Sequence, residues 1–268
     1  MSFTDVFRDP PVDAIAQYPS VPTIFGICFA IVTTVIGIVY TIRTRSPLFF
    51  WAAVAGWTLY PLVVEPFGDW FVAVWYPANM DVAATVFDRP MPWLAVLFYG
   101  GGIPLVTVAA HEITKRGLPA KRLLQLVIAV TILEVPMEIS GAQFGWMQYY
   151  DNHSVIFGVP IYCYVQNGGM FAVVAWVLAW LLPHIHGWRW VVVPFALAAV
   201  LPLFALVTTW PAYLAIHTGA GPVVGWIAGI LATVLNAAVV VACIYSPALD
   251  RLREKAGAGD PPTTVQVA

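Results

Sequence analysis

The sequence has few charged residues and few cysteines for its length. Of its 268 residues only 10% are charged, whereas 60% are hydrophobic and the mean hydropathy is +0.82. A soluble domain carries about 25% charged residues, so this composition excludes a water-soluble globular enzyme and a disordered chain. A net charge of -2 offers no basic surface for a phosphate backbone, which excludes a nucleic-acid partner. The 3 cysteines lie within apolar runs and predict neither a disulfide framework nor a zinc site.

What the chain has instead is long apolar runs. A helix needs about 20 apolar residues to cross the ~30 Å hydrocarbon core of a bilayer. Seven stretches qualify: 22–42, 48–64, 91–110, 123–141, 161–182, 190–209 and 222–245. We therefore expect an all-α polytopic membrane protein, a bundle of seven transmembrane helices.

The distribution of basic residues predicts the orientation of this bundle. When the spans alternate, all of the 12 Lys and Arg residues except Arg8 and Arg89 fall on one side. Basic loops stay in the cytoplasm, so we expect an inner-membrane protein whose N-terminus is outside and whose C-terminus is cytoplasmic. Three parts follow: an extracytoplasmic segment 1–21, a membrane domain 22–245, and a cytoplasmic, largely disordered tail 246–268.

The sequence lacks the residues that several classes of membrane protein need for their chemistry. A retinal Schiff base needs a buried Lys, and no predicted span contains one. A prenyltransferase needs clustered Asp for Mg²⁺, and no predicted span contains an Asp. A di-iron oxygenase needs several neighbouring His, but only His184 and His186 are close, in a short turn where solvated histidines are the expected explanation. We therefore expect no metal and no cofactor.

Two glutamates lie inside the fourth predicted span. Glu134 and Glu138 are four residues apart, which places both carboxyl groups on one helix face. Charged residues inside a span are costly and usually functional, although an interhelical hydrogen-bonding pair is the structural alternative. Two carboxylates without a cation in any span do not both ionise in a medium of low dielectric, so at least one is expected to keep its proton near neutral pH. A protonated acid beside a carboxylate is a general acid with a charge stabiliser.

Other polar residues are expected at the same depth as this pair. Glu65 and Asp69 end the second span, again four residues apart if the helix continues through Pro66; a solvated loop start is the alternative. Further candidates for binding a substrate are Tyr60, Gln166, Asn167 and Asn236. For Gln166 and Asn167, hydrogen bonding between helices is an equally good explanation.

Aromatic residues crowd the two long outer connections. The second connection contributes Trp146, Tyr149 and Tyr150, and Tyr162 follows shortly after it. These rings predict either the mouth of a pocket or an interfacial aromatic belt.

Three segments of the chain carry a family resemblance. LEVPMEISGAQFGWMQYYDNHSVIFGVPIYCYVQNGG, with its acidic pair, its Tyr-rich loop and its Pro-Ile-Tyr element, resembles the spirocyclase AveC-like family of integral membrane proteins. YPLVVEPFGDW and FDRPMPW resemble other elements of that family. The resemblance implies acid-catalysed cyclisation of a polyketide to a spiroketal, with or without dehydration, in the membrane. The layout is also similar to integral-membrane terpene cyclases and, more weakly, to sterol isomerases of the emopamil-binding type.

These observations predict an integral-membrane, cofactor-free acid–base enzyme for a hydrophobic polyketide- or terpenoid-like substrate: a cyclase, dehydratase or isomerase. Glu134 and Glu138 are the expected acids, and Glu65 and Asp69 are expected to complete the catalytic set. The expected partners are that substrate and membrane lipid. Two other classes stay open, a proton-coupled transporter and a lipid-binding membrane protein without chemistry.

Overall fold

The computed structural model describes residues 6–257 and is predominantly helical. Seven of its helices are long and apolar enough to cross a membrane: Val21–Thr44, Leu48–Val72, Trp93–Lys115, Ala120–Gln143, Cys163–His184, Gly187–His217 and Pro222–Ala256. The predicted fold class, an all-α bundle of a multi-pass membrane protein, is therefore confirmed. Which end of the bundle faces the cytoplasm stays a prediction.

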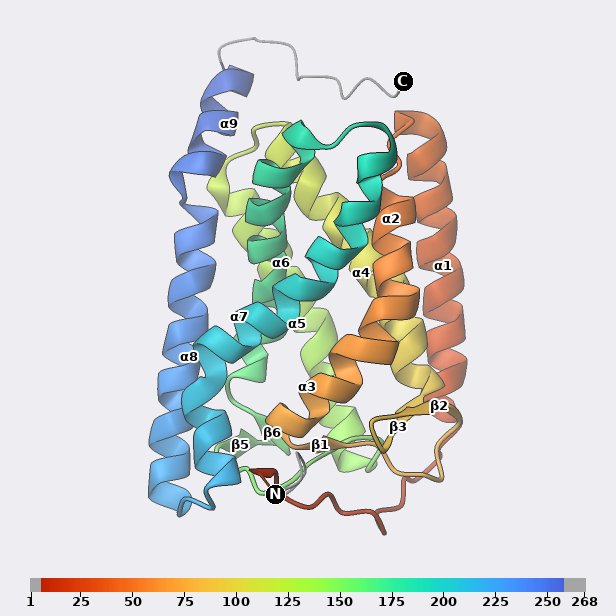
Figure 1. Cartoon of the computed structure of the whole chain (residues 1–268), viewed down its shortest axis with the longest axis vertical. Helices are drawn as coiled ribbons and strands as arrows, with labels where there is room; N and C mark the ends of the chain where they lie inside the picture. Colours follow the sequence, from red (N-terminus) through yellow and green to blue (C-terminus); the bar gives the residue numbers. More distant parts are fainter. Residues whose placement is uncertain (1–5, 258–268) are drawn as a thin grey trace.

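The spans are built from a slightly larger number of helical elements. They are α1 (Val21–Thr44), α2 (Leu48–Val54), a π-helical segment (Ala55–Val64), α3 (Glu65–Val72), α4 (Trp93–Lys115), α5 (Ala120–Gln143), α6 (Cys163–Leu181), α7 (Val192–His217), α8 (Pro222–Ile244) and α9 (Pro247–Gly257). Two short 3₁₀ turns, Leu182–His184 and Gly187–Val191, connect α6 to α7. The helices stand roughly side by side, and α7 crosses the bundle obliquely (Figure 1).

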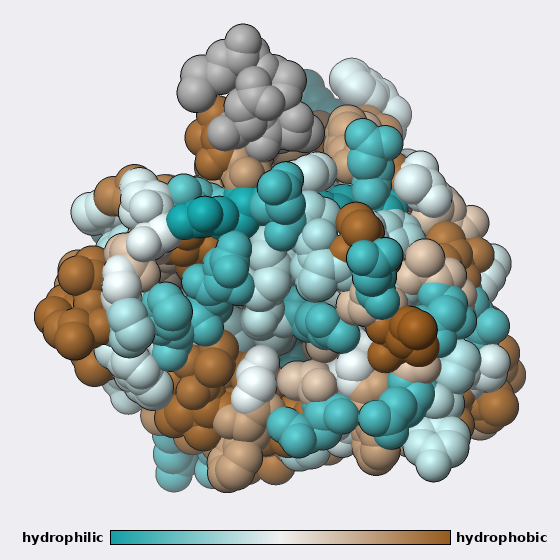
Figure 2. Space-filling view, turned by 90° about the horizontal axis from the view of Figure 1, so that it is seen from below, coloured by the Kyte–Doolittle hydropathy of each residue, from teal (hydrophilic) through white to brown (hydrophobic). Residues whose placement is uncertain are grey.

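Short strands lie at one end of the bundle. They form three antiparallel pairs: β1 (Val74–Trp75) with β4 (Gln148–Tyr149), β2 (Val82–Val86) with β3 (Arg89–Pro92), and β5 (Val155–Ile156) with β6 (Val159–Pro160). We call this the hairpin end; it also carries the described N-terminal residues, while α9 lies at the opposite end (Figure 1). Viewed from the hairpin end, hydrophilic residues gather over the middle of the bundle and hydrophobic residues lie mainly towards the rim (Figure 2).

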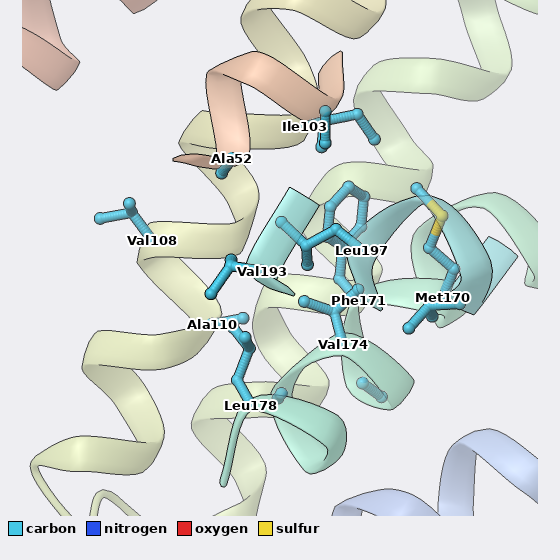
Figure 3. Packing of buried hydrophobic residues seen from close by; sticks show 14 of the residues in the cluster. Ala52, Ile103, Val108, Ala110, Met170, Phe171, Val174, Leu178, Val193 and Leu197 are labelled. Carbon is cyan, nitrogen blue, oxygen red and sulfur yellow. The ribbon is translucent and has the colours of Figure 1, made fainter. Parts of the chain in front are cut away.

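The main apolar core lies towards the opposite end. Side chains of α2, α4, α6 and α7 meet there, among them Ala52, Ile103, Val174 and Leu197 (Figure 3). Helix α5 contributes Leu123 and Val127 to this core, but both α1 and α5 also expose apolar side chains, such as Ile31 and Leu133, to the surroundings. That exposure is what a membrane helix needs, because lipid tails replace water around it.

Several spans are longer than the sequence predicts, and the second and the sixth show why. The second was expected to end at residue 64, but the helix continues to Val72, with Pro66 in the first turn of α3, where no backbone donor is needed. The sixth was expected to end at residue 209, but α7 continues through Pro211 to His217, because membrane helices tolerate internal proline.

The expected disordered tail from residue 246 begins with an ordered element. Residues 247–257 form the helix α9. The rest of the expected tail, 258–268, and the first five residues of segment 1–21 lie outside the described residues.

Candidate active site

The structure brings the two acidic pairs together at the hairpin end. Glu65 and Asp69 lie one turn apart on α3, and Glu134 and Glu138 lie one turn apart on α5. Glu65 is close enough to interact electrostatically with both glutamates of α5. We call these four residues the acid cluster. Its assembly supports the expectation that residues from the second and fourth spans share one site.

Glu65 is held by two tyrosine hydroxyl groups. The hydroxyl of Tyr76 donates a hydrogen bond of 2.6 Å to Oε1, and the hydroxyl of Tyr99 donates to Oε2. The π-helical segment sets the position of Glu65, whose N–H bonds to the carbonyl of Tyr60, five residues earlier. Gly56 allows α4 to approach, because a side chain there would collide with the carbonyl of Tyr99. π-helical turns of this kind occur often at functional sites.

Asp69 lies beside a buried arginine that comes from a different element. Asp69 is only 4% exposed, and its Oδ2 has no hydrogen-bond partner among the described residues. Arg89, at the start of β3, is 1% exposed and interacts electrostatically with Asp69 without forming an ion pair within 4.0 Å. Arg89 lies in the connection between the second and third spans, and its side chain is buried at the site. The acid cluster therefore has a cationic neighbour that the sequence did not predict.

The Arg89 guanidinium is held by neutral groups. Nη1 donates to the carbonyl of Val74 at 2.8 Å, and Nη2 donates to the hydroxyl of Tyr150 at 2.7 Å. The guanidinium carbon lies 3.9 Å from the centre of a Trp70 ring, a cation–π contact. Its enclosed Nε has no partner within residues 6–257.

The pair on α5 has fewer partners. Oε1 of Glu138 accepts hydrogen bonds from Nδ2 of Asn167 at 2.6 Å and from the hydroxyl of Tyr149 at 3.3 Å. Oε2 of Glu138 and Oε2 of Glu134 are enclosed and have no partner in the described part of the chain. An enclosed acid oxygen without a partner is costly.

Close packing of α5 on α6 places this pair. Gly168 of α6 lies against Thr131 and the carbonyl of Val127 on α5, where a side chain would have no room. The other face of α5 is open, with Ile132 64% and Leu133 73% exposed. Glu134 therefore sits between the protein interior and the lipid-facing surface.

The tyrosines of the hairpin end are neutral donors. Burial, together with the nearby carboxyl group of Glu65, raises the pKa of the Tyr76 hydroxyl well above its usual value. Burial also raises the pKa of Tyr149 and that of Tyr162 well above the usual value. Each of these hydroxyl groups therefore keeps its proton and can donate it in a hydrogen bond near neutral pH.

The aromatic residues that were predicted to bind a substrate make several different hydrogen bonds. The hydroxyl of Tyr150 accepts from Arg89, and that of Tyr162 accepts from Asn152 at 3.1 Å. The indole N–H of Trp146 donates to the carbonyl of Gln17 at 2.6 Å. Tyr150 thus adjoins the acid cluster, while Trp146 fastens the N-terminal segment.

Tyr60 lies one layer below the cluster. It is completely buried, its hydroxyl donates to the carbonyl of Leu197 at 2.9 Å, and its ring packs 5.3 Å from the ring of Tyr99. Tyr60 therefore supports Tyr99, which in turn holds Glu65.

The predicted polar residues of the fifth and seventh spans divide into two groups. Asn167 contacts the acid cluster through Glu138. Gln166 and Asn236 instead meet at Thr209 of α7: Asn236 donates to its hydroxyl at 2.9 Å, and that hydroxyl donates to Gln166 at 3.2 Å. These two hydrogen bonds join α6, α7 and α8. Gln166 therefore makes the hydrogen bond between helices that was the alternative to a role in substrate binding.

The N-terminal segment 6–20 lies across the hairpin end as a strap. Asn79 exchanges two hydrogen bonds of 2.9 Å with the backbone of Ala16. The backbone N–H of Arg8 donates to Nδ1 of His217, whose Nε2 lies 3.0 Å from the carbonyl of Phe71. The strap therefore ties the first residues to α7 and to both long connections.

Two surface hollows among the described residues lie away from the acid cluster. One is an apolar groove on α6, lined by Trp176, Val177, Trp180, Leu181 and His184. The other is a shallow depression beside residues 151–154. Neither includes a carboxyl group of the cluster, so the expected opening above the acids is not one of them. Within residues 6–257, no three His, Cys, Asp or Glu side chains are arranged to hold a metal ion.

Three residues of the site were not singled out as site residues from the sequence: Tyr76, Tyr99 and Arg89. Tyr76 lies in the first of the two aromatic connections, where nothing marks it out from the other rings, and Tyr99 carries no local signal of a polar contact. Arg89 did carry a signal, because it is one of only two basic residues on the predicted outer side and lies near tryptophans in the sequence.

Comparison of the chain with protein-family models, with curated proteins and with solved structures found no match.

Proposed function

We propose that this protein is an integral-membrane acid–base enzyme acting on a hydrophobic substrate. The observation that carries the proposal is the convergence of four carboxyl groups from α3 and α5 into one cluster that retains unpartnered acid oxygens. Intramembrane carboxyl groups are costly and mark functional sites. The wider surroundings are aromatic, which suits a substrate that develops positive charge.

Glu134 is the proposed proton donor. Its enclosed oxygen has no partner, and its position towards the open face of α5 suits delivery to a molecule dissolved in lipid. The acid protonates an alkene carbon or a carbonyl, epoxide or alcohol oxygen of the substrate, and a carbon–carbon or carbon–oxygen bond closes the ring. The substrate then returns a proton to the carboxylate of Glu138. Transfer of that proton from Glu138 to Glu134 restores the starting state, so the net reaction is an isomerisation, or a loss of water when an alcohol leaves.

A narrower assignment follows from the resemblance to the spirocyclase AveC-like family. The segments that carry it include Glu65, Asp69, Glu134 and Glu138, all of which belong to the cluster. We propose cyclisation of a polyketide- or terpenoid-like lipid as the reaction class. The proposed location is the inner membrane with the hairpin end outside, supported by the basic residues Lys115, Arg116, Lys121 and Arg122, which lie at and between the ends of α4 and α5 away from the hairpins.

The test is proton transfer in heavy water. Membranes containing the protein are incubated in D₂O with an organic extract of host-cell lipids, and the products are analysed by mass spectrometry for isomers or dehydrated species that carry deuterium. Glu134→Gln is expected to reduce product formation by about 10²- to 10⁴-fold, and Glu138→Gln to reduce it as well.

Glu112→Gln is the matched control. Glu112 is also a glutamate in a span, but it lies at the opposite end, bonded to Tyr40 and Arg116. This variant should retain wild-type product formation. Full turnover in both Glu134→Gln and Glu138→Gln, at normal expression, would contradict the proposed mechanism.

The rival classes make different predictions. A proton-coupled transporter requires a polar path to the opposite end, where the apolar core lies (Figure 3). It would acidify the lumen of vesicles containing the protein when a substrate gradient is applied. A lipid-binding protein without chemistry would retain a co-purifying lipid and give no deuterated product.

A further inference from the structure

We infer that the apolar groove on α6 binds an anionic phospholipid of the surrounding leaflet, whose acyl chain lies along Trp176 and Trp180 and whose phosphate lies near His184. Helix α6 runs from the hairpin end to the opposite end of the bundle, where this groove lies (Figure 1). The groove contains no residue of the acid cluster, so the inference does not depend on the proposed enzymatic function.

The groove has the size and the lining of a ligand site. Its volume is about 620 Å³, and ligand sites occupy about 300–1,000 Å³. Trp176 and Trp180, one turn apart, are 36% and 53% exposed, and Val177 and Leu181 line the groove beside them. The lining ends at His184, in the 3₁₀ turn that follows α6. A belt of interfacial tryptophans explains exposed rings, but it does not explain an apolar hollow that leads to a polar side chain.

The polar groups of the groove lack partners within the protein. The indole N–H groups of Trp176 and Trp180 make no hydrogen bond within residues 6–257. Nδ1 of His184 lies 2.9 Å from the carbonyl oxygen of Trp180. A carbonyl oxygen only accepts, so Nδ1 carries a hydrogen and Nε2 is left for an outside partner. Ester and phosphate oxygens of a phospholipid accept from indole N–H groups, and a headgroup hydroxyl can donate to Nε2.

The end at which the groove opens is strongly basic. All but two of the 12 Lys and Arg residues lie there. The acidic residues are fewer, and in the described part of the chain they are Glu112, Asp250 and Glu254. The first two already pair with Arg116 at 3.0 Å and with Arg253 at 2.6 Å. Basic surroundings of this kind between membrane helices bind phosphate headgroups.

The connection after α6 keeps one of these basic residues near the groove. It folds into two consecutive 3₁₀ turns, in which the N–H of Ile185 bonds to the carbonyl of Leu182 and the N–H of Arg189 to that of His186. This compact path holds the exposed Arg189 close to the end of α6, within reach of a headgroup beside His184.

The neighbouring helices add further positive charge. Helices α5 and α9 both pack against α6. The start of α5 carries the exposed Lys121 and Arg122, and α9 carries the exposed Arg251. Each basic residue near the membrane surface strengthens binding of an anionic lipid about fivefold, whereas a zwitterionic lipid gains little. The groove is therefore expected to select its occupant by headgroup charge.

Photo-crosslinking tests the inference on the whole protein. The purified chain is reconstituted in phosphatidylcholine vesicles that contain a trace of phosphatidylglycerol with a diazirine in one acyl chain. After irradiation, the labelled residues are mapped by mass spectrometry. Labelling should concentrate within residues 176–184 and should decrease when unlabelled phosphatidylglycerol is added, but not when phosphatidylethanolamine is added. Labelling spread evenly over the helices, or absent from 176–184 because a second copy covers the groove, would overturn the inference.

Variants of the tryptophans test the apolar part of the site. Trp180→Ala removes a large part of the lining and should reduce labelling of residues 176–184 about tenfold. Trp210→Ala is the matched control, because Trp210 is also 53% exposed but lies on α7, outside the groove. That variant should leave the labelling of residues 176–184 unchanged. Equal effects of the two substitutions would contradict a defined lipid site on α6.

A second pair of variants tests the selection by charge. Arg189→Gln should lower the preference for phosphatidylglycerol over phosphatidylethanolamine about fivefold. Arg45→Gln is its control, since Arg45 is an exposed arginine at the same end of the bundle but follows α1. An equal loss in both variants would mean that only the general surface potential attracts the lipid, and the site assigned to α6 would be wrong.

Discussion

The two acidic pairs have the same spacing on their helices but different surroundings. On α3, Glu65 is bonded by two tyrosine hydroxyl groups and Asp69 lies beside a buried guanidinium. On α5, Glu138 has two donors on one oxygen, and no hydrogen bond holds Glu134 in the described residues. A carboxyl pair at i and i+4 thus does not determine its own chemistry; the elements packed against it do.

This difference suggests a division of roles. The α3 pair is enclosed by the hairpins and is connected to neutral donors and a cation, which suits a fixed charge. The α5 pair lies on a peripheral helix and retains unpartnered oxygens, which suits proton exchange with a substrate. Four experiments can break or sharpen this comparison.

The largest expected effect distinguishes the two pairs by stability. Glu65→Ala leaves the hydroxyl groups of Tyr76 and Tyr99 without acceptors and should lower the free energy of unfolding by about 3 kcal/mol. Glu134→Ala removes no hydrogen bond and should lower it by about 1 kcal/mol or less. Unfolding in mixed micelles with increasing denaturing detergent measures both. Equal losses would remove the distinction between a fixed pair and an exchanging pair.

The second experiment disturbs the packing that positions the α5 pair. Gly168→Ala would push α6 away from Thr131 and Val127, and should lower the free energy of unfolding by about 2 kcal/mol. Gly102→Ala is the control, since the nearest atoms to its new methyl group would be those of the Phe29 ring at 3.9 Å. That variant should retain or slightly increase stability. If both variants unfold alike, close packing of α5 on α6 does not set the position of Glu134.

The third experiment separates the two donors of Glu138. Asn167→Ala removes the bond of 2.6 Å and should cost about 1–1.5 kcal/mol, whereas Tyr149→Phe removes the bond of 3.3 Å and should cost about 0.5 kcal/mol. The same detergent titration measures the two variants. The reverse order would mean that Tyr149, and not Asn167, is the principal partner of the α5 pair.

The smallest effect concerns alkaline pH. The raised pKa of Tyr76 means that the folded state keeps a proton that the unfolded chain releases near pH 10, so its contribution to stability is complete below pH 10 and decreases above it. The expected loss is about 0.4 kcal/mol at pH 10 from this residue. Tyr76→Phe should reduce the slope of unfolding free energy against pH between pH 9 and 11. An unchanged slope would show that Tyr76 ionises equally in both states.

The seven spans could be predicted because each is a long apolar run between charged or turn-forming residues. The ends of two spans could not, because Pro66 and Pro211 lie inside continuous helices and the acidic residues after residue 64 resemble the start of a loop. Glu134 and Glu138 could be singled out from the high cost of a charge within a span. Their convergence with Glu65 and Asp69 was expected from depth alone, and the structure places the two pairs together.

The sequence pattern could not predict which side chains contact the acidic residues. Tyr99 reaches Glu65 only because Gly56 lets α4 approach, and Arg89 enters the site because β3 packs against α3. Both contacts depend on the tertiary arrangement of segments that are distant in the sequence. Gln166 and Asn167 show the same limit: they are adjacent in the chain, yet they join different networks because successive helical positions face in different directions.

The strap has a consequence for biogenesis. Arg8 finds its partner 209 positions later in the chain, at His217. This contact of Arg8 cannot form until α7 has been synthesised, so the strap is completed late in the assembly of the bundle.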